Sequence, residues 1–172
     1  MISKPLNDEY APFSANYIKL VDDSDVIPLL EELKDKSYDL LYNLSDEKAN
    51  YAYAEGKWTV KQSLGHMIDT ERTFAYRLLY FSRTAVELPG FDQDIFVDNA
   101  HFNDSSIQDL ATEFRAAREA NLFMIKALTE EQLLKSGIAS GYRVSVRALV
   151  FMMAGHELHH HQLFKEKYGI HQ

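Results

Sequence analysis

Apolar side chains recur every three or four residues along four long segments of the chain, the spacing that places them on one face of an α-helix. Each segment begins near a residue with a capping side chain: Asp25, Thr59 (in a capping box with Gln62), Ser105 or Ser106, and Ser145. The four predicted helices span about residues 25–44, 59–83, 105–128 and 145–168. Because no convincing strand run accompanies them, the pattern predicts an all-α four-helix bundle in a single domain, residues 1–172.

The connection between the second and third predicted helices is long, from about Arg83 to Asp104. It contains Leu88-Pro-Gly-Phe-Asp92, and Pro-Gly stops regular structure. A connection of this length can cross the bundle, which argues against a simple up-down-up-down path, and it is often functional. Between the third and fourth helices the sequence predicts a short helical turn, Thr129–Leu134, and then a turn or small hairpin, Gly137–Val144.

Charge and composition limit the partners. A formal net charge of −8 repels phosphate backbones and anionic lipid, so we expect neither a nucleic-acid nor a membrane partner. The chain has no cysteine, which excludes disulfides, thiolate metal ligands and a cysteine nucleophile. The N-terminal residues lack the apolar core of a signal peptide, and no apolar run is long enough to span a bilayer. We therefore expect a cytoplasmic protein.

Four histidines lie together in the last predicted helix, within Gly155-His-Glu-Leu-His-His-His161. His156 and His160 are four residues apart, so they stack one turn above the other inside the apolar stripe and can direct two ring nitrogens at one metal ion. Two buried imidazoles without partners would cost roughly 1–3 kcal/mol each, which either a metal ion or hydrogen bonds from other helices would offset. His159 and His161, at the two edges of the stripe, are expected in solvent or at its rim, although His159 is also a fallback ligand.

A third ligand has to come from another part of the chain. His66 lies inside the second predicted helix and follows Gly65, just as His156 follows Gly155. A glycine in mid-helix costs up to about 1 kcal/mol, so these two pairs indicate a packing or access reason. His66 lies at the flank of its apolar stripe, however, and spacing alone supports it less well than His156 and His160.

Two local motifs indicate other metal chemistries. His156-Glu-x-x-His160 matches the H-E-x-x-H of zinc proteases, in which the glutamate is the general base. The extended form of that motif requires glycine and histidine where this chain has Leu163 and Glu166, which disfavours a protease. Glu157-x-x-His160 matches half of a di-iron carboxylate site, but the sequence has no second such pair.

Three acidic residues near the histidines are candidates for proton transfer: Glu157, Glu71 and Asp69. Each could accept a hydrogen bond from a ligand histidine or act as a base on water. The alternative for Glu71 and Glu157, which fall near the apolar stripes, is a structural ion pair between helices. The arginines considered as partners are Arg72, Arg77 and Arg147.

With these residues in place, the chain resembles the DinB-like (DinB/YfiT-like) superfamily of metal-dependent bacterial proteins. The resemblance covers nearly the whole chain and rests on the order and spacing of several short motifs. These are Glu9-Tyr-Ala-Pro-Phe13, Gly56-Lys-Trp-Thr-Val-Lys61, Leu64-Gly-His-Met-Ile-Asp-Thr-Glu-Arg72, Leu88-Pro-Gly-Phe-Asp92, Val144-Ser-Val-Arg-Ala-Leu149 and Gly155-His-Glu-Leu-His-His160. It implies an up-down-down-up bundle, often a homodimer, in which the long second connection is the crossover between parallel neighbours.

The resemblance also implies that His66, His156 and His160 bind one divalent metal ion (Ni, Zn or Fe) near one end of the bundle. Characterised relatives include thiol S-transferases and isomerases that use low-molecular-weight thiols, and many members have no known activity. Three imidazoles leave a coordination position open for water or a thiol. We therefore expect a metal-dependent enzyme acting on a small-molecule substrate, either a thiol S-transferase or a hydrolase. The alternative is a non-catalytic metal-binding or stress-response module.

Overall fold

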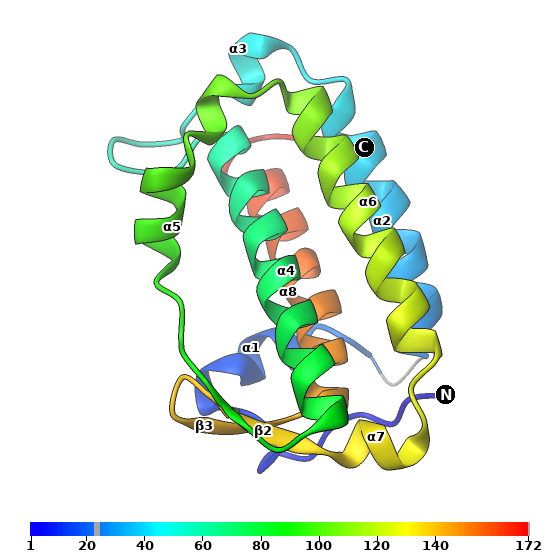
Figure 1. The fold of residues 1–172 in the computed structure, drawn as a ribbon. Helices are drawn as coiled ribbons and strands as arrows, with labels where there is room; N and C mark the ends of the chain where they lie inside the picture. Colours follow the sequence, from blue (N-terminus) through cyan, green and yellow to red (C-terminus); the bar gives the residue numbers. More distant parts are fainter. Residues whose placement is uncertain (23–24, 172) are drawn as a thin grey trace.

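Four long helices form the bundle in the computed structural model, which describes residues 1–22 and 25–171 (Figure 1). They are α2 (Val26–Tyr42), α4 (Val60–Arg83), α6 (Ile107–Lys126) and α8 (Val146–Glu166). Each begins at a predicted cap, because the side chains of Asp25, Thr59, Ser106 and Ser145 accept hydrogen bonds from backbone N–H groups in the first turn. The predicted helices and their starts are therefore confirmed.

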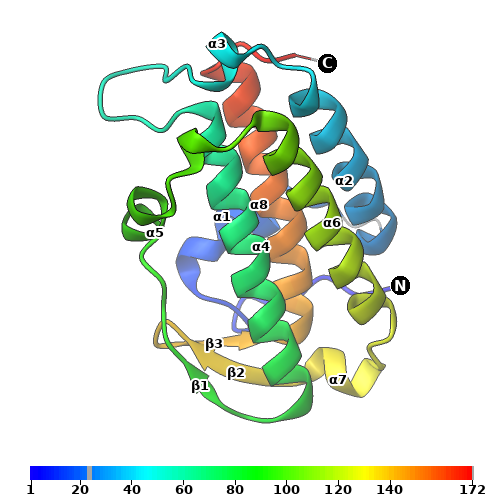
Figure 2. The same cartoon turned by 45° about the horizontal axis from the view of Figure 1, so that its top comes forward.

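Two helices run in each direction. α2 and α8 rise through the bundle while α4 and α6 descend, and α2 and α4 each pack against both α6 and α8 (Figure 1). The connection from α4 to α6 returns along the length of the bundle, so it joins two parallel neighbours (Figure 2). This is the up-down-down-up topology that the resemblance implied. Short helices α3 (Asp46–Ala49) and α7 (Glu130–Leu134) lie in the other two connections.

The long connection contains more regular structure than the sequence indicated. It holds β1 (Glu87–Leu88), α5 (Gln93–Ala100) and a 3-10 turn at Phe102–Asp104. The Asp92 carboxylate accepts hydrogen bonds from two backbone N–H groups of the first turn of α5, so a helix restarts soon after Pro-Gly. α5 ends at His101, whose φ of 54° is left-handed.

A small sheet closes the lower end of the bundle (Figure 2). β2 (Ser136–Ala139) and β3 (Tyr142–Ser145) are antiparallel and form the predicted hairpin. Ser140 and Gly141, with φ of 53° and 79°, supply the positive φ angles that a tight hairpin turn needs. β1 adds a parallel third strand beside β2. The sequence did not predict it, because a strand of two residues carries no alternation.

An N-terminal segment without a predicted element packs against α8. It forms a 3-10 turn (Pro12–Ser14) and the short helix α1 (Ala15–Ile18). Glu9 anchors the segment, because its carboxylate accepts hydrogen bonds from Arg147 Nε at 2.7 Å and Ser145 Oγ at 2.6 Å. The hydrogen bond from Arg147, with that from Ser145, lowers the pKa of Glu9 to about 2. The segment is thus fixed to the first turn of α8.

The core consists of two apolar clusters with a polar layer between them. The cluster toward the sheet includes Phe81 and Phe151, and the cluster toward the other end includes Phe114 and Phe164. Between them each long helix contributes buried polar side chains at the same height. This polar layer consists of Ser37, His66, Thr70, Glu71, Arg118, His156, Glu157 and His160. None of the described helices combines the length and hydropathy that a bilayer-spanning segment needs.

Candidate metal centre

The three predicted metal ligands meet between α4 and α8. His66, His156 and His160 are all buried, with 4%, 6% and 4% of their surface exposed. His156 Nε2 lies 3.0 Å from His66 Nε2 and 3.2 Å from His160 Nε2. A tetrahedral ion with metal–nitrogen distances of about 2.0–2.1 Å separates its ligand nitrogens by about 3.3 Å. The spacing of the ring nitrogens therefore fits one bound ion.

Burial keeps these imidazoles neutral. It lowers the pKa of His66 to about 4, and burial together with the neighbouring histidines lowers the pKa values of His156 and His160 well below the ordinary value. A neutral imidazole carries a lone pair on one ring nitrogen and so can bind a cation. All three residues offer ligand atoms within 4.8 Å of one another, so the donor set fits a divalent metal ion. The centre lies between the two apolar clusters, close to the second turn of α4.

The Nδ1 atoms of His66 and His160, which face away from the cluster of Nε2 atoms, differ in their hydrogen-bond partners. A ligand histidine usually donates its other N–H to an acceptor. His66 Nδ1 lies 3.5 Å from Thr70 Oγ1, at the limit of a hydrogen bond, and His160 Nδ1 is buried with no partner among the described residues. An unmatched buried polar atom costs about 1–3 kcal/mol. An unmatched buried polar atom of this kind is typical of functional sites, and an ion on the other ring nitrogen of His160 is consistent with one.

The glycines beside the ligands admit close neighbours, as the sequence predicted. A Cβ atom at Gly155 would lie 2.2 Å from the backbone oxygen of Tyr17, and one at Gly65 would lie 2.2 Å from the ring of Phe102. Gly155 thus lets α1 approach α8, and Gly65 lets the long connection approach α4. The packing reason inferred from mid-helix glycines is confirmed at both positions.

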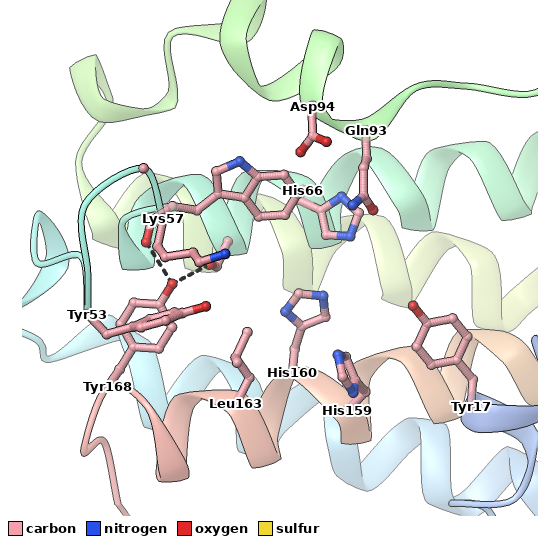
Figure 3. Close-up of a pocket in the computed structure, with 13 residues that line it drawn as sticks. Tyr17, Tyr53, Lys57, His66, Gln93, Asp94, His159, His160, Leu163 and Tyr168 are labelled. Carbon is pink, nitrogen blue, oxygen red and sulfur yellow. Dashed lines mark hydrogen bonds between the residues drawn. The ribbon is translucent and has the colours of Figure 1, made fainter. Parts of the chain in front are cut away.

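Two adjoining cavities reach the histidines. The first, of about 350 Å³, is lined by His66 and His160 and is shown in Figure 3. The second, of about 260 Å³, is lined by His66 and His156 and extends to the hairpin of the sheet. Tyr17, His66 and Gln93 line both cavities. The histidine cluster therefore has access to two spaces that a small molecule can occupy.

The first cavity is mostly polar. Lys57, Asp94 and the exposed His159 line it, and Asp94 projects from α5 above the histidines (Figure 3). Trp58 packs beside the metal centre with its ring 4.9 Å from that of His66. Tyr168 Oη donates a hydrogen bond of 2.7 Å to the Trp58 carbonyl, which fixes that loop to the end of α8. The long connection, expected to be functional from its length, thus provides one wall of the site.

Glu71 and Glu157 belong to a buried ion-pair network instead of lining a cavity. Arg118 donates to both Glu71 oxygens, at 2.8 and 2.9 Å, and its Nη1 donates to one oxygen of Glu157. The other oxygen of Glu157 accepts a hydrogen bond from Ser37 Oγ. The structural alternative considered from the sequence is therefore present, with a different arginine. None of the arginines named there, Arg72, Arg77 and Arg147, forms it.

Arg118 was missed, although the sequence carried a signal for it. It continues the apolar series Leu110, Phe114 and Leu122 on α6 at helical spacing, and it is 1% exposed. A charge inside an apolar stripe needs a buried counter-charge. Burial acts to lower the pKa of Arg118, but its two carboxylate partners raise it above the ordinary value. Burial raises the pKa of Glu157.

The remaining predicted residues lie at the margins. Asp69, whose pKa is raised by burial, lies outside both cavities and 4.0 Å from a guanidinium nitrogen of Arg72. His161 lies at the rim of the buried helix face, as expected, where it is partly buried with Nε2 2.7 Å from Ser37 Oγ. Since that hydroxyl donates to Glu157, it accepts from His161. The catalytic roles of Glu157, Glu71 and Asp69 stay predictions.

Fold and site together define a helical-bundle protein with a buried three-histidine cluster whose spacing fits a metal ion, and comparison with known proteins agrees. Residues 29–164 match the DinB superfamily, and the chain belongs to that superfamily. It is 30% identical over 123 residues, 69% of each chain, to an Oceanobacillus iheyensis protein provisionally named a metal-dependent hydrolase. The fold resembles that of YfiT from Bacillus subtilis, described provisionally as a metal-dependent hydrolase with an unusual four-helix bundle topology. The TM-score is 0.74 at 15% identity, over 94% of this chain and 91% of that one.

Proposed function

We propose that this protein is a metal-dependent hydrolase of a small molecule, with one divalent ion bound by His66, His156 and His160. The observation that carries the proposal is the cluster of three buried Nε2 atoms, spaced as ligands and open to two cavities. The provisional names of both relatives support the same class of reaction. A closed structural site would offer four protein ligands, whereas a catalytic site keeps one position free.

The metal ion, when bound, lowers the pKa of water at its open position and polarises a substrate carbonyl. The chain's residues orient the substrate and limit access of bulk water. Tyr17 and Gln93 line both cavities and so border any substrate that reaches the histidines. His159 lines the first cavity with its ring 5.5 Å from that of His160, a position from which it can accept a proton.

Metal content tests the ligand set directly. Protein purified without a histidine tag and dialysed against Zn²⁺ or Ni²⁺ should retain about one ion per chain by elemental analysis. His156→Ala should lose it, because two imidazoles remain. His159→Ala is the matched control on the same helical turn, and it should keep the ion. Loss of metal from the control, or equal metal in both variants, would refute the ligand set.

Hydrolysis tests the reaction. Turnover of p-nitrophenyl acetate should fall to the uncatalysed rate after treatment with a chelator and return on adding one divalent ion per chain. His156→Ala should show no return. Metal-loaded protein that hydrolyses none of a panel of small esters and amides would contradict the hydrolase and favour the non-catalytic metal-binding module.

Thiol transfer is the second candidate reaction. Lys57 and Asp94 place a positive and a negative side chain on the first cavity, a pattern that suits the charged groups of a small peptide thiol. Metal-dependent consumption of glutathione or bacillithiol in the presence of an electrophile, measured as loss of free thiol, would favour it over hydrolysis. We also propose the homodimer that the family resemblance implies, which analytical ultracentrifugation tests.

A further inference from the structure

The second cavity follows a row of side chains along α4. His66, Thr70, Phe74 and Arg77 are spaced by four, four and three residues, so they share one face of the helix, and all four line the cavity. The row begins at the metal centre and ends at Arg77, about three helical turns away. One continuous cavity therefore connects the histidines to a buried guanidinium group.

The walls between these two ends are largely apolar. Met152 and Leu149 of α8 lie one and two turns from His156 and line the cavity, and Phe91 of the long connection lines it as well. No Asp or Glu is among the described residues that line it. The cavity thus offers apolar surface along its length and a single guanidinium group at one end.

Arg77 has unused hydrogen-bonding capacity. It is 7% exposed, and its Nη2 donates to the Pro89 carbonyl at 3.2 Å and approaches Ser140 Oγ at 3.5 Å. Its Nε and Nη1 atoms have no partner among the described residues and are not sealed from water. No carboxylate of the described chain lies within ion-pair distance of it, unlike Arg118 and Arg147. Burial lowers the pKa of Arg77, but an arginine stays charged at neutral pH.

A purely structural role explains only part of this arrangement. The bond to Pro89 fixes the long connection to α4, and a neutral donor could make that bond equally well. A buried charge without a counter-ion is costly, whereas a buried charge that meets an anionic ligand gains a charge-assisted bond. Arg77 lies at the end of the second cavity, where an anionic ligand can reach its guanidinium group, and this position gives a reason for the positive charge.

We propose that Arg77 binds the carboxylate of a small apolar organic acid, whose body lies along Phe74 and Met152 and whose other end points toward the histidines. Binding of the carboxylate at Arg77 needs no metal ion. The inference rests on the proposed function only for the reaction of the bound acid's other end at the histidines. One guanidinium balances one negative charge, so a carboxylate fits better than a phosphate dianion in these apolar surroundings. The cavity volume of about 260 Å³ is smaller than that of pockets that hold drug-sized ligands, so the cavity suits a single ring or a short chain.

The test uses metal-free protein, so that a carboxylate cannot bind through an ion. Phenylacetate and hexanoate are titrated against their neutral amides, phenylacetamide and hexanamide, by calorimetry. Wild-type protein should bind the acids about 10–100-fold more tightly than the amides, because only the acids form a charge-assisted bond. Arg77→Gln should remove that preference, Arg77→Lys should keep part of it, and Arg72→Gln, at an exposed position of the same helix, should leave it unchanged.

The outcomes separate this inference from the proposed hydrolase. Equal binding of acid and amide by wild-type protein overturns the inference even if Arg77→Gln does not fold. Unchanged acid binding in a folded Arg77→Gln variant, judged by its melting temperature, overturns it too, and the hydrolase then stands on its metal and turnover data. Arg77-dependent binding of phenylacetate in a protein that takes up no metal supports the inference and removes the hydrolase.

Discussion

Replacing Arg118 by methionine isolates the contribution of the buried ion-pair network. Methionine is apolar and of comparable length, so the main change is the loss of the positive charge between Glu71 and Glu157. Both carboxylates are almost fully buried, at 3% and 1% exposed, and would be left without their counter-charge. Breaking a buried pair in this way costs about 3–5 kcal/mol. For a protein of this size the melting temperature should fall by roughly 6–20 °C at pH 7.

The free energy of unfolding that Arg118→Met loses should be smaller at lower pH. Burial raises the pKa of Glu157 even in the presence of Arg118, and removing the guanidinium raises it further. A carboxyl whose pKa is higher in the folded than in the unfolded state binds its proton more tightly when folded. The free energy of unfolding of Arg118→Met should therefore recover as the pH falls from 7 toward 5. Thermal melts followed by circular dichroism across this range measure the effect.

Two controls define the refutation. Arg72→Met breaks the exposed pair with Glu113 and should change the free energy of unfolding by about 1 kcal/mol or less. Adding Glu71→Gln and Glu157→Gln to Arg118→Met should restore most of the stability, because no unpaired charge remains. If Arg118→Met has the melting temperature of wild type at pH 7, the network is not a buried charge cluster. The same conclusion follows if its loss in free energy of unfolding, relative to wild type, is the same at every pH.

Three further predictions concern other parts of the molecule. Glu9 has a pKa of about 2 in the folded protein, so its contribution to the free energy of unfolding is fully present above the ordinary value of 4.5 and is lost as the pH falls toward 2. The free energies of unfolding of wild type and Glu9→Gln, followed by acid titration, should therefore converge only near a pH of about 2. Gly155→Ala should lower the free energy of unfolding by about 1–3 kcal/mol in urea melts, and Gly65→Ala by less, because the latter meets a ring that can rotate and the former meets backbone. Glu157→Gln should lower the melting temperature while metal content stays at wild-type level; loss of the ion instead would place this carboxylate in support of a ligand.

The helices and their boundaries could be predicted because their signals are local. A capping side chain such as that of Thr59 acts on the N–H groups of its own first turn, and apolar spacing reports one face of one helix. His156 and His160 could be paired for the same reason, since both lie on α8. His66 needed the family resemblance, because which face of α4 meets α8 depends on packing between helices.

The contacts that complete the site are not local. Tyr17 reaches the histidines only because Glu9 fixes the N-terminal segment to the start of α8, more than a hundred residues away in the chain. Arg118 was an unexplained charge in an apolar stripe until its partners on α4 and α8 were in place. α5 was overlooked because Pro-Gly was interpreted as the end of regular structure, and Asp92 was not considered as the cap of a new helix.

The polar layer between the two apolar clusters also determines how the helices align during folding. Sliding one long helix by a single turn, about 5.4 Å, would move its polar residues into one of the hydrocarbon clusters and leave the opposing charges unmatched. Glu71, Arg118 and Glu157 can all be satisfied at only one relative height of α4, α6 and α8. We infer that misaligned bundles are penalised, so the same layer that holds the histidines together selects the native helix register.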